Sequence, residues 1–274
     1  MANRILYSTQ SGTVDGSEVL IQSASCENSI PLEDVMALGK LGPYTRAQKE
    51  VASCKADLKI YAQAGLGTLV SSLVSKATAG TQSAIVVTPN GFSMSGMLSN
   101  FSIDVAKGDF IMASMSFAGM GLATMVTSNL ASANPTDGNP AAFTPITTDN
   151  VTVSGSPSCP TSLKFSLDIP TEIISCIGAT VVGTQAQIIE SNTMIGKVPY
   201  KGAITLEGLT LDTSQPGTTY SAFSIGTATG DGSNNVLKVN ITDAATVSRS
   251  FNQAAGDLGA NYSFNVDGST VEIS

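Results

Sequence analysis

The chain has 274 residues, of which 42% are hydrophobic and 12% are charged, and its formal net charge is −8. A chain this acidic does not hold nucleic acid by neutralising phosphates, because that takes clustered Lys and Arg side chains. The sequence has no histidine, which excludes Ser-His-Asp and Cys-His catalysis and histidine metal sites.

β-Branched residues alternate with small polar ones along much of the chain, as is typical of an all-β protein with many turns. No apolar run reaches the roughly 18 residues that a membrane-spanning helix needs. Residues 1–8 lack a signal-peptide pattern, so we expect no membrane insertion and synthesis in a cytoplasm. The first predicted strand covers residues 18–22.

A short helical turn is predicted for residues 30–39. Pro31 is tolerated at its first position, and Gly39 closes it. Val35 and Leu38 would then face inward, one turn apart.

The next two elements are a strand and a helix. Residues 56–62 alternate between apolar and polar side chains, which predicts a strand. Residues 67–77 carry an apolar stripe with serines opposite, which predicts an amphipathic helix packed on a sheet. The stripe consists of Leu69, Val70, Leu73 and Val74.

Three strands are predicted next, over residues 84–87, 92–105 and 110–117. A turn around Asn90 separates the first two. Residues 106–109 have the length and glycine content of a hairpin loop, so they join the last two.

Residues 129–161 hold five prolines and many Gly, Ser, Asn and Thr residues. This composition predicts a long exposed connector, for which a contact with a neighbouring subunit is a plausible role. The second half has no obvious counterpart of the first-half helix, and residues 212–235 are predicted to form a loop. Its predicted strands are residues 163–167, 203–206, 236–241, 261–266 and 270–273.

The second half also repeats the sequence of the first. Residues 30–39 return as residues 169–178, an offset of 139 (169 minus 30). A later Gly-Asp landmark at Gly108 returns at Gly256, each time ahead of an Ala-x-x-Ser-aromatic strand. Two landmarks in the same order favour one ancestral domain present twice, with a core in each copy.

The repeat predicts the domain organisation of the chain. We expect an all-β fold of two tandem antiparallel β-sandwich or barrel domains, with one short flanking helix in the first. The first domain covers residues 1–128 and the second residues 162–274, and residues 129–161 connect them.

Motifs for catalysis and cofactor binding are absent from the sequence. It has no G-x-x-x-x-G-K-[ST] loop, no complete dinucleotide-binding glycine pattern and no S-x-x-K motif. We therefore expect no enzyme activity, no cofactor and no metal. The four cysteines lack C-x-x-C spacing and are predicted to be small buried residues in a reducing compartment, with a structural disulfide or metal site as the alternative.

Two segments carry a family resemblance. Residues 29–46 contain an Ile-Pro-x-Glu stretch that ends in glycine and is followed by a Gly-Pro-Tyr loop. Residues 91–110 contain a serine-rich hairpin pattern that ends in Gly108-Asp109, ahead of the Ala-Ser-Met-Ser-Phe strand. Together they resemble the tail tube (major tail) proteins of long-tailed bacteriophages. The second copy departs from this pattern, with Val-Val-Gly at residues 181–183 in place of the Gly-Pro-Tyr loop.

The resemblance implies two small antiparallel sheets with a flanking helix, in subunits that join their inner sheets into a continuous barrel. Stacked rings of this kind form the tube for DNA ejection. With two copies in one chain, we expect trimeric rings with pseudo-sixfold symmetry. The resemblance further implies a structural virion protein of the phage tail, assembled in the host cytoplasm. Its partners would be copies of itself, other tail proteins at the tube ends, and genomic DNA that passes without specific binding.

The acidic balance fits a lumen that repels DNA phosphates. Asp104 and Asp109 flank the last hairpin of the first copy and are the candidate lumen-facing acids, with solvated turn charges as the alternative. The alternative function is an immunoglobulin-like adhesin or a capsid decoration module, because low charge and paired β domains fit those classes too.

Overall fold

The computed structural model describes residues 10–48, 51–62, 65–88, 91–106, 111–126, 151–153, 160–176, 191–196, 201–208, 223–226, 235–252 and 261–274. The described part of the chain is rich in strands and has one helix. The elements are β1 (Gln10–Val14), β2 (Ser17–Ser29), β3 (Leu32–Met36), β4 (Pro43–Gln48), β5 (Ser53–Tyr61), α1 (Leu66–Thr78), β6 (Ser83–Thr88), β7 (Phe92–Ala106), β8 (Met112–Met120), β9 (Thr124–Met125), β10 (Val151–Val153), β11 (Pro160–Asp168), β12 (Thr171–Cys176), β13 (Ser191–Gly196), β14 (Lys201–Gly208), β15 (Phe223–Gly226), β16 (Asn235–Asn252) and β17 (Asn261–Ile273).

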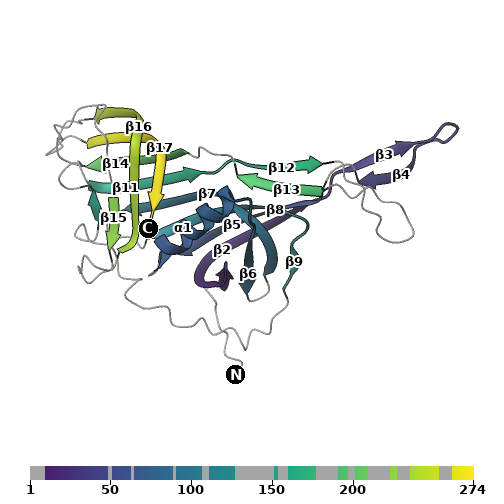
Figure 1. Cartoon of the computed structure of the whole chain (residues 1–274), viewed down its shortest axis with the longest axis horizontal. Coiled ribbons are helices and arrows are strands. Elements are labelled where there is room, and N and C mark those ends of the chain that lie inside the picture. The colour runs from purple at the N-terminus through teal and green to yellow at the C-terminus, as the bar shows by residue number, and fades with distance from the viewer. Residues whose placement is uncertain are drawn as a thin grey trace, which may run out of the picture.

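Thirteen of these strands form one sheet that is organised around β7 (Figure 1). Six strands, in the order β7-β6-β1-β2-β5-β8, close into a barrel-like ring because β8 also pairs with β7. Strand β11 pairs with β7 on the same edge as β6. From β11 the sheet continues through six strands in the order β11-β14-β17-β16-β15-β10. The hairpins β3–β4 and β12–β13 are separate two-stranded sheets on the same side of the body. The strand-rich fold agrees with the predicted all-β class.

The strands form where the sequence alternates. In β5, Cys54, Ala56, Leu58 and Ile60 are buried, and the polar residues between them are partly or fully exposed. This confirms the strand predicted for residues 56–62. The same period-two burial continues in β8 and in the described side chains of β11, so each strand gives one face to the core and one to solvent.

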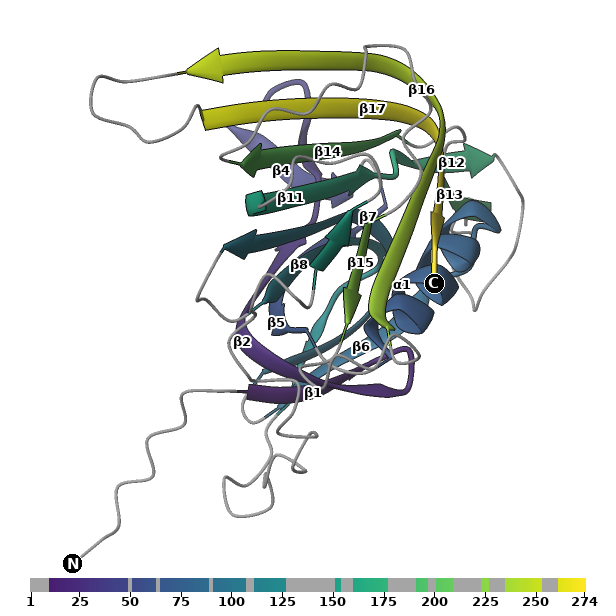
Figure 2. The same ribbon diagram turned by 90° about the vertical axis from the view of Figure 1, so that its left-hand side faces the viewer.

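Three long strands bend at β-bulges. The pairing register shifts by one residue within the β2–β5, β7–β8 and β16–β17 pairs. An extra residue on one strand increases its twist and bends it. Figure 2 shows the result for β16, which turns out of the main sheet toward α1. The shifts lie between Ile21 and Ser23, between Leu98 and Asn100, and between Ala244 and Thr246.

Helix α1 confirms the helix predicted for residues 67–77. It follows Gly65, whose positive φ of 85° is a conformation that favours glycine. Its predicted apolar stripe faces the core, and Val74, at the margin of the stripe, is partly buried. The buried residues of the helix are Leu66, Gly67, Leu69, Val70, Leu73 and Ala77.

The backbone of α1 lies directly against the last residue of the chain. A Cβ atom built on Gly67 would stand 2.1 Å from the carbonyl oxygen of Ser274. Ser274 is itself fixed by two backbone hydrogen bonds with Lys238 of β16, at 2.7 and 2.9 Å. The helix of the first half therefore packs closely on strands of the second half, and glycine is what permits this approach.

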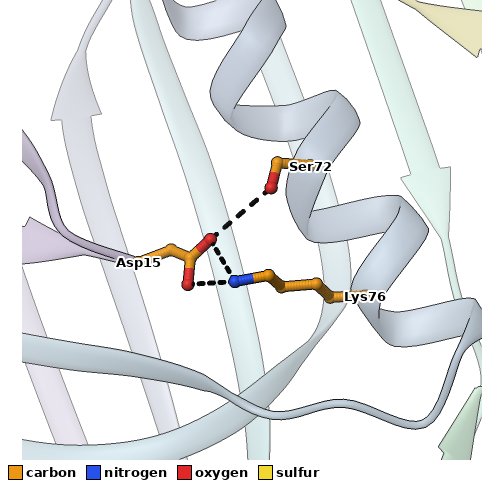
Figure 3. A network of polar contacts seen from close by, with 3 residues as sticks. All are labelled: Asp15, Ser72 and Lys76. Atoms are coloured by element: carbon orange, nitrogen blue, oxygen red, sulfur yellow. Dashed lines mark hydrogen bonds and ion pairs between the residues drawn. The ribbon is translucent and has the colours of Figure 1, made fainter.

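A polar network ties α1 to the hairpin that begins the barrel (Figure 3). Asp15 and Gly16, with φ of 55° and 79°, form the two-residue loop between β1 and β2, as a type I′ Asp-Gly turn requires. Lys76 Nζ donates to the two carboxylate oxygens of Asp15 at 2.5 and 2.6 Å, and Ser72 Oγ donates to one of them at 3.5 Å. The Asp15 side chain is only 18% exposed.

The core runs through both halves of the chain. We expected a separate core in each copy, but the described buried hydrophobic residues form one cluster that includes residues of β7, β11, β16 and β17. Phe101 of β7 and Phe165 of β11 meet in it, with ring centroids 6.2 Å apart and ring planes at 60°. Because β11 pairs directly with β7, the inner faces of the two halves are continuous.

The helical turn predicted for residues 30–39 is wrong. This segment contains β3, which pairs with β4 in a hairpin. Val35 and Leu38, predicted to face inward, are 41% and 108% exposed. The glycine that we read as a helix stop, Gly39, has φ of 85° and lies with Gly42 at the hairpin tip instead. Because the segment lies away from the body of the protein, its backbone N–H and C=O groups find their partners in the pairing between β3 and β4. Residues 169–178, which repeat residues 30–39, likewise contain a strand, β12.

Most other predicted elements of the first half are confirmed, whereas the connector and the second half differ from the prediction at several points. Residues 261–266 and 270–273, predicted as two strands, form the single strand β17. Strand β10 lies within the predicted connector and β15 within the predicted loop of residues 212–235. Residues 127–150, 154–159, 209–222 and 227–234 lie outside the described residues, as do the turn at residues 89–90 and the joint at residues 107–110.

Candidate assembly surface

Eight strands of the large sheet lie side by side in the order β2-β5-β8-β7-β11-β14-β17-β16 (Figure 2). Each is antiparallel to its neighbour. Where the side chains of these strands are described, one face of the run packs against the core and α1, and the opposite face is open to solvent. We call the second face the polar face, and its charges, curvature and two edges are the features that bear on function.

The polar face carries short hydrogen-bonding side chains in rows across the strands. In one row, Asp57 of β5, Ser116 of β8, Asn100 of β7 and Asp168 of β11 lie opposite one another. The Ser116 hydroxyl donates to the Asp57 carboxylate at 2.6 Å, and the Asn100 amide donates to the Asp168 carboxylate. Such cross-strand pairs stabilise neighbouring strands on their solvent side.

Asp104, a predicted lumen-facing acid, lies on the polar face within β7. It stands directly opposite Lys164 of β11, and its carboxylate is 3.3 Å from the Lys164 ammonium group. Both side chains are 62% exposed, so this ion pair contributes at most about 1 kcal/mol to stability. Asp109, the other predicted acid, lies outside the described residues.

The charges of the polar face nearly balance. From residue 23 of β2 across β5, β8, β7 and β11, the described side chains on this face include four carboxylates and three lysines. Most of these charged residues were not predicted from the sequence, although the alternation in β5 indicates that Asp57 and Lys59 share one face. The carboxylates belong to Glu27, Asp57, Asp104 and Asp168, and the lysines are Lys55, Lys59 and Lys164.

The polar face is hollowed near the junction of the two halves. An open hollow of about 810 Å³ lies over β5, β8, β7 and β11, and its lining includes Tyr61, Ser102, Asp104 and Lys164. The sheet is therefore concave on its solvent side at this place.

Both ends of the eight-strand run have open edges. Strand β2 pairs with β1 only over residues 17–21, so in the described structure residues 23–29 pair with β5 alone. Strand β16 pairs with β15 only over residues 235–239, so residues 246–252 pair there with β17 alone. Open edges present unpaired backbone groups to any strand that approaches.

Inward-facing side chains at the open edge of β2 are incompletely covered. Ala24 and Cys26 pack against the core but remain partly exposed. Leu163 and Phe165, on the inner face of β11, are only 2% and 1% exposed, because β11 has a strand on each side. A further strand beside β2 would cover Ala24 and Cys26 in the same way.

The β3–β4 hairpin, with the residues at its base (residues 30–48), is an exposed apolar arm. An ion pair between Arg46 Nε and Asp34 Oδ1, at 2.8 Å, and the Lys40 ammonium 5.3 Å from the Tyr44 ring centre stabilise its shape. Apolar side chains grouped on a projecting element are typical of an interaction surface. The exposed large hydrophobic residues of the arm are Ile30, Leu32, Val35, Met36, Leu38, Leu41 and Tyr44.

Two of the four cysteines have described side chains, and both are free thiols. Cys54 is buried, as predicted, and Cys26 is partly buried. Burial raises the pKa of the Cys26 thiol. Burial also raises the pKa of Cys54, with a further rise from Cys26 and a smaller opposing effect of a hydrogen bond with the Ala123 backbone. The raised pKa values leave less of either thiol in the reactive thiolate form at neutral pH.

Within the described residues, no group of three or more His, Cys, Asp or Glu side chains is arranged to hold a metal ion. No helix in that part of the chain is long and apolar enough to cross a membrane. No protein-family model matches the sequence, and no curated protein matches it.

Proposed function

We propose that this chain is a structural subunit that polymerises edge to edge into rings and hollow tubes, like the phage tail tube proteins that it resembles. The proposal depends on a feature of the chain itself. The eight-strand run consists of two four-strand groups, β2-β5-β8-β7 and β11-β14-β17-β16, with equivalent order and pairing. These groups are joined edge to edge by the β7–β11 pair.

Matching registers support a tandem origin of the two groups. Ser25 of β2 pairs with Asp57 of β5, and Lys164 of β11 pairs with Thr205 of β14. The offset from Ser25 to Lys164 is 139 (164 minus 25), the value found in the sequence, and the offset from Asp57 to Thr205 is 148 (205 minus 57). The same two offsets relate every pair along these strands from residue 23 to residue 29.

Two further correspondences extend the repeat. The hairpin after β2 begins with β3 at Leu32, and the hairpin after β11 begins with β12 at Thr171, again with an offset of 139 (171 minus 32). The β7–β8 and β16–β17 pairs each carry a bulge that shifts the register by one residue. We therefore retain residues 1–128 and 162–274 as the two copies, with residues 129–161 as connector.

The β7–β11 junction is the observation that carries the proposal. Here two equivalent groups already associate through antiparallel strand edges. The outer edges of the run, on β2 and β16, are open in the described structure. Head-to-tail contacts between such edges form a ring if the rotation closes. Three copies would give about 24 strands, a backbone circle about 52 Å across and a bore of about 40 Å, wide enough for duplex DNA.

The polar face suits the lumen of such a tube. Among its described side chains from β2 to β11, lysines are interspersed with carboxylates, and Lys164 is paired with Asp104. This described part of the face therefore lacks the clustered cations that bind phosphates. In this proposal DNA passes along short Ser, Asn and Asp side chains without being held. The tube belongs to the tail of the virion, and other tail proteins bind at its two ends.

Electron microscopy of the purified full chain tests the proposal. Hollow rings or filaments about 50 to 100 Å wide are expected, a range that brackets the circle calculated for 24 strands. Compact trimers that do not stack would favour a capsid decoration module instead. A monodisperse monomer at high concentration would rule out self-assembly by this chain alone.

A further inference from the structure

The way in which one copy contacts the next can be derived from the junction inside the chain. In that junction β7 and β11 pair antiparallel over seven residues, from Asn100 opposite Asp168 to Ala106 opposite Ser162. Asp104 lies opposite Lys164 near its centre. If the halves are repeats, the same contact is available between β16 and β2, the two outer strands of the eight-strand run, when β16 belongs to one copy and β2 to the next.

The offsets of the repeat fix the register of that contact. Strand β11 corresponds to β2 through the offset of 139, and β14 corresponds to β5 through the offset of 148. The offset of 148 also relates β7 to β16. Asp57 is linked to Asn100 through Ser116, and Thr205 is linked to Ser248 through Asn265 (248 minus 100). Lys164 therefore maps to Ser25 (164 minus 139) and Asp104 maps to Asn252 (104 plus 148). We infer that residues 248–252 of β16 pair antiparallel with residues 25–29 of β2 in the next copy, with Asn252 opposite Ser25 and Ser248 opposite Ser29.

The edge positions of both segments agree with this register. Residues 25–29 of β2 lie within the stretch that pairs with β5 alone in the described structure, and residues 248–252 of β16 lie within the stretch that pairs with β17 alone. Phe251 comes opposite Cys26, at the position where Ile103 lies opposite Phe165 inside the chain. A neighbouring β16 would thus cover the inner side of β2, where Cys26 is partly exposed.

The charges along the two strands favour the register as well. Glu27 comes opposite Ser250, and Asn28 comes opposite Arg249, so no two like charges face each other. A slip by one residue would send the side chains of β16 to the opposite faces relative to β2. The ion pair of the internal junction, Lys164 with Asp104, is replaced by the neutral pair Ser25 with Asn252.

This inference rests on the proposed function. Its test therefore uses engineered disulfides, which report the register of the β16–β2 contact, while microscopy reports separately whether rings or tubes form. In a full chain with its four cysteines changed to alanine, two matched pairs are introduced: S25C with N252C, and S29C with S248C. Two crossed pairs, S25C with S248C and S29C with N252C, serve as controls. Cβ atoms of residues directly opposite each other stand about 4.5–5.5 Å apart, whereas crossed pairs are four residues out of register and too far apart to form a disulfide.

After mild oxidation, the matched pairs are expected to give covalent dimers and trimers on denaturing gels, at least tenfold more than the crossed pairs. Cross-linking of the crossed pairs alone would overturn the register. Tubes in the micrographs without cross-linking of the matched pairs would overturn it too, while leaving the proposed function in place. If the cysteine-free parent folds but forms neither rings nor tubes, and no pair cross-links, both the register and the proposed function are wrong.

Discussion

At the scale of single residues, two lysines form ion pairs in very different surroundings. Lys76 meets Asp15 at 2.5 Å, and the Asp15 side chain is only 18% exposed. Lys164 meets Asp104 at 3.3 Å with both side chains 62% exposed. An ion pair contributes to stability mainly where removing one partner leaves a poorly solvated charge.

Lys76→Met is therefore expected to lower the free energy of unfolding by about 1–3 kcal/mol, because it leaves the Asp15 carboxylate with Ser72 as its remaining side-chain partner in Figure 3. Lys164→Met, the matched control, is expected to change it by less than about 1 kcal/mol. Urea unfolding of both variants measures the difference. Equal losses would contradict the view that the β1–β2 turn anchors the helix through this pair.

At the scale of elements, α1 joins the two halves through a backbone contact. Gly67 lies inside the helix, where alanine ordinarily stabilises by about 1 kcal/mol relative to glycine. Here the added Cβ would stand 2.1 Å from the carbonyl oxygen of Ser274, so the helix and the last strand would have to move apart.

Gly67→Ala is accordingly expected to destabilise the protein by about 1–3 kcal/mol. The loss is expected to shrink when Ser274 is also deleted, because the obstructing carbonyl is removed. Ser71→Ala on the same helix is the control and should be nearly neutral. Thermal unfolding of the three variants measures this, and a stabilising Gly67→Ala would show that the contact is looser than described.

At the scale of the whole molecule, substitutions on the polar face test whether this face lines the channel of the proposed tube. Replacing Asp104 and Asp109 with Lys should leave folding intact, because Asp104 is an exposed charge that contributes little to stability and charges in turns cost little. In a phage that carries the double variant, tubes are expected to assemble but to release DNA poorly, since the added cations would hold phosphates. Tail microscopy and plaque counts measure the two effects. Normal infectivity would mean that these residues do not line the channel.

Local patterns predicted those elements whose signal is periodic and unambiguous. The stripe of Leu69, Val70 and Leu73 specified a helix, and the alternation around Leu58 specified a strand. Gly39 shows why other elements could not be predicted. A glycine with positive φ ends a helix or closes a hairpin equally well, and only the lack of a surface to pack against excludes the helix.

The candidate surface was predictable only in part. Asp104 was identified from its place beside a hairpin, but its partner Lys164 lies on β11, in the other half of the chain. Nothing local indicates that β11 pairs with β7, because strand neighbours far apart in sequence are chosen by the closure of the whole sheet.

The sequence by itself determined that the chain is rich in strands, that it has a helix with one apolar side, and that a motif of the first half returns in the second. These properties depend on neighbours a few positions apart or on direct comparison of two segments. Only the tertiary structure decided that β7 and β11 share an edge, that one core serves both halves, and that β2 and β16 keep open edges in the described structure. Those outcomes depend on which long-range strand pairs bury the most apolar surface together, and a linear pattern does not contain that information.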